Sequence, residues 1–177
     1  SDTDAMAVNL DADGAVLILH MDEGSGSTTA DGSPASNDGS VTAPIWSGGR
    51  FFGAVGFDGS TWIGVEDDDS LDFTGDFSMD WWMRTDDIGS RWRSVFTKGD
   101  TYNYSVWIFQ DELHFSGVNS SGTYVETSEV ATSIGDGQWH HYAVVVGGGS
   151  IDIYEDGVAI ASTGFSGSLR TNSAPLH

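Results

Sequence analysis

The sequence contains no cysteine, a single lysine and only three prolines. Without cysteine, a disulfide scaffold and thiolate chemistry are both excluded. No apolar run approaches the ~20 residues that a helix needs to cross a bilayer, so we expect no membrane insertion. Basic residues are also scarce, with six lysines and arginines against 27 aspartates and glutamates, for a formal net charge of −21. Because phosphate groups would be repelled, nucleic acids and anionic membrane surfaces are poor partners.

The acidic excess itself has two interpretations. One is a solvated, halophile-like surface, on which salt screens the repulsion between carboxylates. The other is the binding of cations by some of the carboxylates. The composition alone leaves both open.

The remaining composition predicts a folded domain built from strands. A chain of 177 residues with 38% hydrophobic and 12% aromatic residues can bury a core, which argues against disorder. Its 24 glycines and the absence of helix-period stretches favour many strands and turns.

Residues 135–162 carry the clearest strand pattern. Between residues 138 and 146, alternation places Trp139 and His141 on one face and His140 and Tyr142 on the other. A glycine-rich loop follows, and residues 151–155 alternate again. Asp156-Gly157 is a strong hairpin signal, after which residues 158–162 return as a third strand.

This stretch resembles a known family. The pattern D-G-x-W-H-H-x-A-V-V, followed by I-x-I-Y-x-D-G-V, is similar to laminin-G-like, concanavalin A-like jelly rolls. F-D-G at residues 57–59 and the strand around Trp82 extend the resemblance to most of the chain. It implies an all-β fold, a two-sheet antiparallel β-sandwich, and an extracellular or cell-surface setting. We expect residues 1–14 to form a polar lead-in or linker and residues 15–177 to form the domain.

The other expected strands follow from alternation between turn signals. They cover residues 15–21, 41–46 and 77–84, a hairpin of residues 51–58 with 61–65, and a meander of residues 93–98, 104–109, 113–115 and 124–126. The core is expected to include Phe77, Met79, Trp81, Trp139 and Ile153.

Calcium is the cofactor that the sequence suggests. Asp22, Asp31, Asn37 and Asp38 lie in one turn-rich segment and offer the oxygen ligands that calcium prefers. Domains that this chain resembles often hold a structural calcium near such a segment. The acidic residues 66–69 are a second candidate. The alternative for both is a solvated loop without an ion.

Two outward-facing aromatic positions suggest carbohydrate binding. Trp82 shares its strand face with Asp80 and Arg84, and Trp107 shares its face with Ser105 and Phe109. An exposed aromatic ring beside hydrogen-bonding groups is a typical sugar platform. The alternative is that loops cover these faces.

Signals for catalysis are missing from the sequence. Glucanases of the resembling fold carry Glu-x-Asp-x-x-Glu on one strand, and that motif does not occur here. There is no G-x-S-x-G elbow either, and adjacent histidines at 140 and 141 point to opposite faces. We therefore predict no catalytic residues and no enzymatic activity.

The sequence thus leads to ranked hypotheses about function. The first is a non-catalytic extracellular or cell-surface module that binds a glycan or mediates adhesion, with a glycan or a cell-surface protein as partner. The alternatives are a structural subunit of a surface layer or filament, and a glycosidase. The resemblance also implies a further strand after Leu176. We therefore expect either a fragment of a longer protein or a gap filled by another segment. That segment is the N-terminal lead-in or a strand from a neighbouring subunit, the latter giving self-assembly through an unpaired sheet edge.

Overall fold

A computed structural model describes residues 14–99 and 103–177, so most of the predicted lead-in lies outside the described residues. Contacts within the chain divide it into two compact units, residues 1–66 and residues 67–177. In the part of the chain that the structure describes, no helix has the length and apolar character required to traverse a membrane.

The first unit contains a small sheet and a separate hairpin. The sheet has the order β1 (Thr28–Thr29), β2 (Gly39–Thr42) and β5 (Trp62–Val65), and all its pairs are antiparallel. The hairpin joins β3 (Trp46–Gly48) to β4 (Gly53–Val55). Val41, Val55 and Ile63 form a small buried core in this unit.

Three strand predictions in this unit are wrong. Residues 41–46 do not form one strand, because β2 ends at Thr42 and β3 begins at Trp46. β5 pairs with β2, and β4 pairs with β3, so the expected hairpin of residues 51–58 with 61–65 does not form. A turn closed by a hydrogen bond from Gly49 N to Phe52 O makes the β3–β4 pairing local, which keeps its loop-closure cost low. Residues 15–21 form only an isolated bridge, Leu19 with Asp31, because the Ile18 N–H donates to the Asp31 side chain at 2.7 Å.

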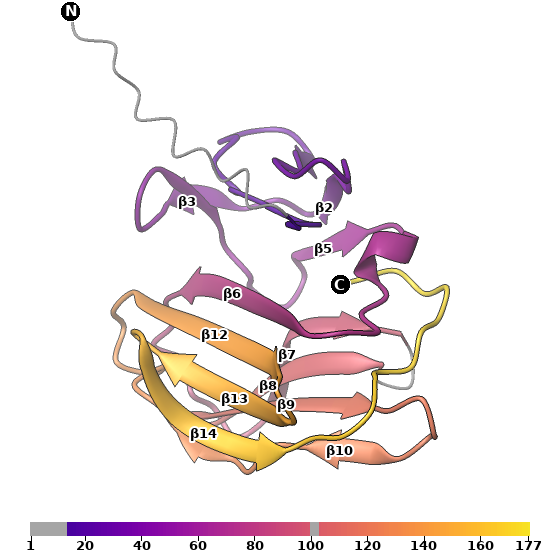
Figure 1. The fold of residues 1–177 in the computed structure, drawn as a ribbon. Helices are drawn as coiled ribbons and strands as arrows, with labels where there is room; N and C mark the ends of the chain where they lie inside the picture. The colour runs from indigo at the N-terminus through magenta and orange to yellow at the C-terminus, as the bar shows by residue number, and fades with distance from the viewer. Residues whose placement is uncertain (1–13, 100–102) are drawn as a thin grey trace, which may run out of the picture. The chain divides into compact units, whose positions relative to one another are not determined.

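The second unit is the predicted sandwich of two antiparallel sheets (Figure 1). The four-stranded sheet has the order β14 (Val158–Gly164), β13 (Ser150–Glu155), β12 (His140–Gly147) and β6 (Phe77–Met83). The five-stranded sheet has the order β10 (Tyr124–Glu126), β9 (Glu112–Val118), β8 (Tyr104–Phe109) and β7 (Trp92–Lys98), and β11 (Val130–Ala131) also pairs with β9. The meander predicted for residues 93–126 is confirmed, and a short 3₁₀ helix, Asp69–Leu71, precedes β6.

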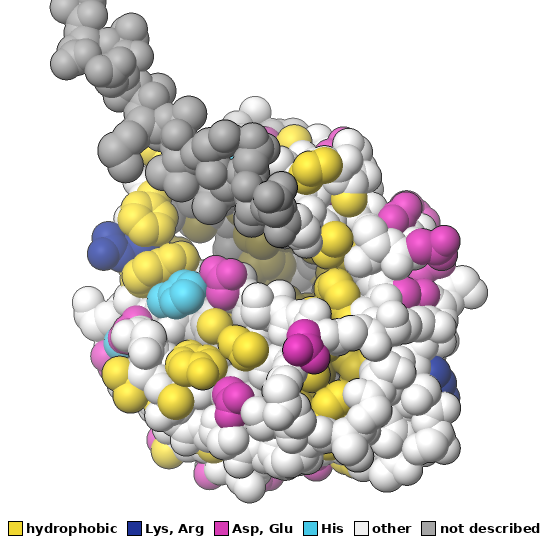
Figure 2. All heavy atoms as spheres, in the orientation of Figure 1, with side chains coloured by type: hydrophobic (Ala, Val, Ile, Leu, Met, Phe, Trp, Pro, Cys, Tyr) yellow, Lys and Arg dark blue, Asp and Glu magenta, His cyan; other side chains and the backbone are white. Residues whose placement is uncertain are grey.

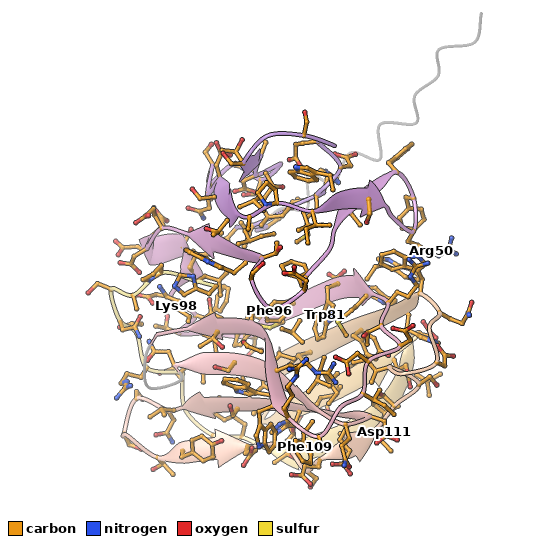
Figure 3. The ribbon with its side chains drawn as sticks, turned by 180° about the vertical axis from the view of Figure 1, so that it is seen from behind. Arg50, Trp81, Phe96, Lys98, Phe109 and Asp111 are labelled. Atoms are coloured by element: carbon orange, nitrogen blue, oxygen red, sulfur yellow. The ribbon has the colours of Figure 1, made fainter. Side chains whose placement is uncertain are left out.

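The core of the second unit lies between the two sheets. Its buried residues include Tyr142, Val144 and Ile153 from one sheet, and Val106 and Phe115 from the other. Phe77, Met79 and Trp81 pack against this cluster, as predicted, and Figure 3 shows Trp81 beside Phe96 of the facing sheet. Trp139 was also expected in the core, and that prediction is wrong. Because Tyr142 and Val144 face inward, the alternation of β12 turns Trp139 to the other side.

The hairpin between β13 and β14 forms where the sequence predicts it. Asp156 and Gly157 adopt φ angles of 48° and 79°, and two consecutive positive φ values are what a type I′ hairpin turn requires. The turn links Glu155 directly to Val158 in the ladder.

The last described residues add to the edge of the five-stranded sheet. Leu176 forms a bridge with Lys98, while Thr97 and His177 exchange both backbone hydrogen bonds, at 2.8 and 2.9 Å. This pairing covers one end of β7. The further strand that the family resemblance implies stays a prediction.

Candidate functional site

Strand β6 directs two of the predicted ligand-binding side chains, Asp80 and Trp82, away from the core. Its residues alternate between partly buried and exposed, with Phe77, Met79 and Trp81 inward and Ser78, Asp80 and Trp82 outward. The Trp82 side chain is 39% exposed. Trp82 and Asp80 therefore lie on the outer face of the four-stranded sheet, as the sequence pattern predicts.

The pairing of β6 with β12 adds a histidine to this face. Register places His141 directly opposite Trp82, and their ring centroids lie 5.3 Å apart. His141 Nε2 lies 3.0 Å from Asp80 Oδ1, so the imidazole joins the aromatic ring to the carboxylate. Figure 2 shows acidic and hydrophobic side chains beside one another over the four-stranded sheet.

Arg84 and Trp139 extend the same surface beyond the end of β6. The Arg84 guanidinium lies 5.3 Å from the centroid of the Trp139 ring, a distance at which a cation and an aromatic face attract each other. Sequence reasoning missed His141 and Trp139 as members of this surface. Their strand alternation placed them on one face, but it gave no sign that this face adjoins Trp82. We call Asp80, Trp82, Arg84, Trp139 and His141 the Trp82 surface.

Trp107 does not belong to the Trp82 surface. It lies on β8 in the five-stranded sheet, where its neighbours Val106 and Ile108 point into the core. Trp107 therefore points outward from the opposite sheet of the sandwich. The four ligand-binding residues that the sequence suggested are thus divided between two faces.

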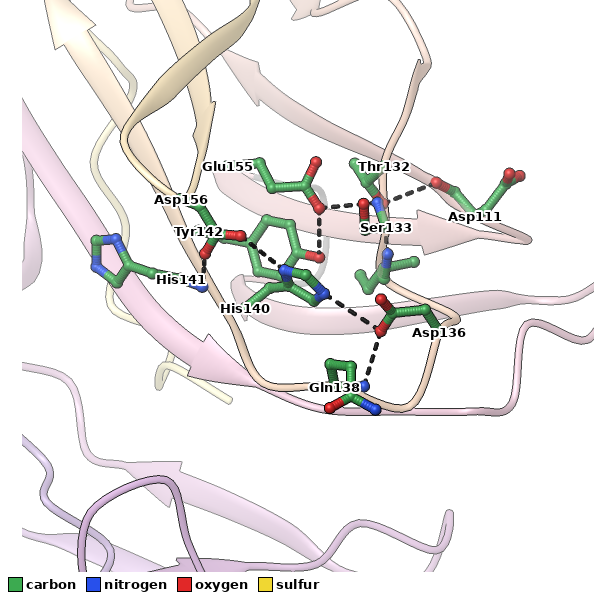
Figure 4. A network of polar contacts seen from close by, with 11 residues as sticks. Asp111, Thr132, Ser133, Asp136, Gln138, His140, His141, Tyr142, Glu155 and Asp156 are labelled. Atoms are coloured by element: carbon green, nitrogen blue, oxygen red, sulfur yellow. Dashed lines mark hydrogen bonds and ion pairs between the residues drawn. The ribbon is translucent and has the colours of Figure 1, made fainter.

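Next to the Trp82 surface, a histidine is held between two carboxylates (Figure 4). His140 Nδ1 lies 2.7 Å from Asp156 Oδ2, and His140 Nε2 lies 3.2 Å from Asp136 Oδ1. The hydrogen bond to Asp156, aided by the one to Asp136, raises the pKa of His140 above 6.5 despite partial burial. Asp156 also accepts a hydrogen bond from the His141 backbone N–H at 3.0 Å, which connects this network to the Trp82 surface.

The same network extends to the β11–β12 connection. The Tyr142 hydroxyl donates to Glu155 Oε1 at 3.0 Å, and the Ser133 backbone N–H donates to the same oxygen at 2.8 Å. Burial, together with the nearby Glu155 carboxylate, raises the pKa of Tyr142. Tyr142 therefore stays a hydrogen-bond donor at neutral pH, and the network fixes the backbone that carries His140 and His141.

We expect the contribution of His140 to stability to depend on pH. A raised folded-state pKa means that the contribution is fully present below the unfolded-state pKa, near 6.5, and is lost as pH rises through the folded value. The melting-temperature difference between wild type and His140→Phe should therefore be largest at mildly acidic pH and shrink above neutrality.

The control for this measurement is His20→Gln, which removes an exposed histidine from the first unit. It corrects for the general benefit of any positive charge on a protein with a net charge of −21. A His140→Phe difference that is constant from pH 5 to pH 9 would contradict the double carboxylate contact.

Three of the four predicted calcium ligands gather around the loop after β1. The Asp31 carboxylate accepts four hydrogen bonds, from Ile18 N, Ser33 N, Ser33 Oγ and Asn37 N. Burial acts to raise the pKa of Asp31, but these hydrogen bonds outweigh it and hold the pKa below its usual value. Asp38 Oδ1 accepts a hydrogen bond from Asp31 N at 2.9 Å.

Asp22, the fourth predicted ligand, lies against the β3–β4 hairpin. A Cβ atom added to Gly53 would lie 2.7 Å from Asp22 Cα. Because both Asp31 oxygens already accept two hydrogen bonds each, Asp31 could bind a metal ion only by giving up some of them. Within residues 14–99 and 103–177, no group of three or more histidine, aspartate or glutamate side chains is arranged to hold a metal ion. Calcium in this loop stays a prediction.

The second acidic candidate, residues 66–69, is also engaged in structural contacts. Asp68 Oδ1 caps the 3₁₀ helix by accepting from Ser70 N at 2.9 Å, and Asp67 Oδ1 lies 2.6 Å from Lys98 Nζ. Two of the four carboxylates in this segment therefore have structural roles that need no bound ion.

Comparison with known proteins agrees with this architecture. The family model described as the concanavalin A-like lectin/glucanases superfamily matches residues 57–177, which is more than half of the chain. A search of curated proteins finds no match to the sequence.

Similar solved structures include the binding domain of Paraclostridial Mosquitocidal Protein 1, at TM-score 0.74 and 16% identity, covering 91% of this chain and 43% of that one. The botulinum neurotoxin serotype G binding domain gives TM-score 0.72 and 18% identity, covering 92% and 42%. The third structure is of botulinum neurotoxin type C, a toxin whose cell entry depends on interaction with two ganglioside molecules. It gives TM-score 0.68 and 15% identity, covering 92% of this chain and 42% of that one. The chain spans less than half the length of these structures, and the likeness is one of fold. The family match over more than half of the chain shows that the chain belongs to the concanavalin A-like lectin/glucanase superfamily.

Proposed function

We propose that this chain is a non-catalytic glycan-binding module that acts at a cell surface or outside the cell. The observation that carries the proposal is the Trp82 surface, where a partly exposed tryptophan adjoins an imidazole–carboxylate pair. A sugar ring offers an apolar face of C–H groups for stacking and hydroxyls around its rim for hydrogen bonding. Trp82 suits the first need, and Asp80, His141 and Arg84 suit the second.

The comparisons support this proposal at the level of fold. Two of the similar structures are binding domains, and the third belongs to a neurotoxin whose cell entry depends on interaction with two ganglioside molecules. This chain spans only 42–43% of those structures, so their ligands do not transfer to it directly. The electrostatics of this chain point to a different preference. With a net charge of −21, we expect neutral glycans to bind better than sialylated ones.

We expect the protein to bind a subset of neutral glycans on a glycan array. Trp82→Ala should lower the affinity for these glycans about tenfold, because it removes one aromatic stacking contact. The matched control is Trp62→Ala, which removes a similarly exposed tryptophan from the first unit. Isothermal titration with the best array hits measures the affinities of both variants and of wild type.

Equal losses of glycan affinity in Trp62→Ala and Trp82→Ala would refute the Trp82 surface as the binding site. Absence of binding across the array, combined with concentration-dependent assembly in light scattering, would favour a structural subunit. Turnover of a glycan in the same samples would favour a glycosidase.

A structural calcium ion in the Asp31 loop remains a second part of the proposal. If it binds the folded state alone, a hundredfold excess over its dissociation constant stabilises the fold by about 2.7 kcal/mol. For a domain of this size, that corresponds to a melting shift of roughly 5–10 °C on chelation.

Ionic strength has to be constant in this measurement, because any cation screens the excess negative charge. Asp38→Asn is the sharper variant, because asparagine keeps an oxygen that can accept from Asp31 N, whereas Asp31→Ala removes four hydrogen bonds that hold the loop without an ion. Magnesium should replace calcium poorly because it prefers a tighter octahedral shell. An unchanged melting curve on chelation would show that the site does not exist.

A further inference from the structure

The outer face of the five-stranded sheet carries a second group of aromatic and polar side chains. Along β8, the outward positions are Ser105, Trp107 and Phe109, because Val106 and Ile108 face the core. On β9, His114 is the residue opposite Trp107, and it points the same way because Leu113 and Phe115 face inward.

Two polar atoms on this face are buried and lack a hydrogen-bond partner. Among the described residues, they are His114 Nε2 and Ser105 Oγ. His114 is only 2% exposed, and Ser105 is fully buried. Buried polar groups in native proteins nearly always have partners, so a pair of orphans on one face indicates that something else supplies them.

The hydrogen-bond partner of His114 Nδ1 determines which kind of group can bond to His114 Nε2. His114 Nδ1 lies 2.9 Å from Glu126 Oε1, and an ionised carboxylate only accepts hydrogen bonds. Nδ1 therefore carries the proton, and in the neutral ring Nε2 is an acceptor. A hydroxyl completes this site, because it can donate to Nε2 of the neutral ring and can accept from Nε2 of a protonated ring.

Trp92 covers this position and is itself accessible. It is the first residue of β7, and its ring centroid lies 4.7 Å from that of His114 and 4.8 Å from that of Phe109. Half of its surface is exposed. Trp92 pairs with Phe109 at the end of the β7–β8 ladder, so a rotation of its ring would leave the rest of that pairing in place.

We propose that this face is a second sugar-binding site, in which Trp92 is a movable cover. A neutral sugar stacks between the displaced Trp92 ring and Trp107, one hydroxyl donates to His114 Nε2, and Ser105 Oγ bonds another. The two sites lie on opposite sheets of the sandwich, so the module is bivalent and links two glycan chains. The ligand class rests on the proposed glycan binding, whereas the location rests on the orphan atoms.

The two histidines make separate reporters for the two sites. In protein labelled with ¹⁵N-histidine, the ring nitrogens of His141 report the Trp82 surface and those of His114 report the second site. We expect titration with lactose, cellobiose and maltose to shift His114 Nε2 for at least one sugar. Trp82→Ala should leave that shift intact, and Trp107→Ala should remove it while leaving the His141 shift.

His114→Phe supplies a readout that does not depend on sugar. Phenylalanine keeps a ring in place and removes the orphan acceptor, but it also removes the hydrogen bond to Glu126, so its stability is compared with that of Glu126→Leu, which removes that bond alone. His114→Phe should be at least as stable as Glu126→Leu, because it leaves no buried nitrogen without a partner. The same variant should weaken sugar binding in a Trp82→Ala background about tenfold, as expected for the loss of one buried hydrogen bond.

Each outcome separates the two sites. Shifts at His141 without any at His114 would overturn the second site and leave the proposed function standing. No shift at either histidine with any of the three sugars would overturn both. A destabilised His114→Phe protein with unchanged sugar affinity would show that the imidazole is structural, which also overturns the second site.

Discussion

Replacing Lys98 with methionine should lower the free energy of unfolding by about 3–5 kcal/mol, the usual result of removing one partner from a buried ion pair. The only lysine of the chain is fully buried at the end of β7, as Figure 3 locates it. Its ammonium lies 2.6 Å from Asp67 Oδ1, 2.8 Å from the Ala174 carbonyl oxygen and 3.7 Å from Asp72 Oδ1. Methionine has a similar shape, so the loss comes mainly from two carboxylates left without their cation. Because both carboxylates are partly exposed, we expect the lower part of the range.

Urea unfolding followed by tryptophan fluorescence measures this change. Arg91→Met is the control, because the Arg91–Asp87 pair is exposed at both ends and such pairs contribute about 0–1 kcal/mol. Neutralising the carboxylates with Asp67→Asn and Asp72→Asn in the Lys98→Met background should recover part of the loss. A Lys98→Met protein as stable as wild type would show that the buried ammonium contributes nothing to stability.

Replacing Trp81 with alanine should also cost about 3–5 kcal/mol, because the change leaves a large cavity between the sheets. The Trp81 ring meets Phe96 edge-on at 4.8 Å between centroids and lies 5.8 Å from Tyr142. Phe96 belongs to the five-stranded sheet and Tyr142 to the four-stranded one, so Trp81 joins the two layers.

The adjacent residue is the control for Trp81. Trp82→Ala removes the same type of side chain from the outer face and should cost distinctly less. Trp81→Phe should fall between the two. It leaves a smaller cavity than alanine and removes the indole N–H, which in the described residues is buried without a partner. Equal losses of stability at positions 81 and 82 would contradict the assignment of inner and outer faces.

Much of the second unit follows from the sequence because its signals are local. Alternation in residues 77–84 correctly separates Trp81 from Trp82, and the turn Asp156-Gly157 fixes the pairing of β13 with β14. A positive φ at both turn residues sets the register next to the turn, and a bulge between Ile153 and Tyr154 shifts it by one residue further along the ladder. The prediction that Trp139 lies in the core is wrong. Both faces of this strand are apolar, so alternation alone does not tell which face points into the core.

What the tertiary structure alone decided is which strands lie side by side. β6 and β12 are separated by more than fifty residues, yet their register brings His141 to Trp82 and Asp80 and so creates the Trp82 surface. The surroundings of His114 are also set by non-local pairing. Strand β8 places Trp107 opposite His114, and Glu126 contacts its Nδ1, which leaves Nε2 without a partner in the described residues. Sequence periodicity determines which side chains share a face of one strand. The neighbour of that face is chosen by the packing of the whole core, because non-local pairing must offset the entropy of closing long loops.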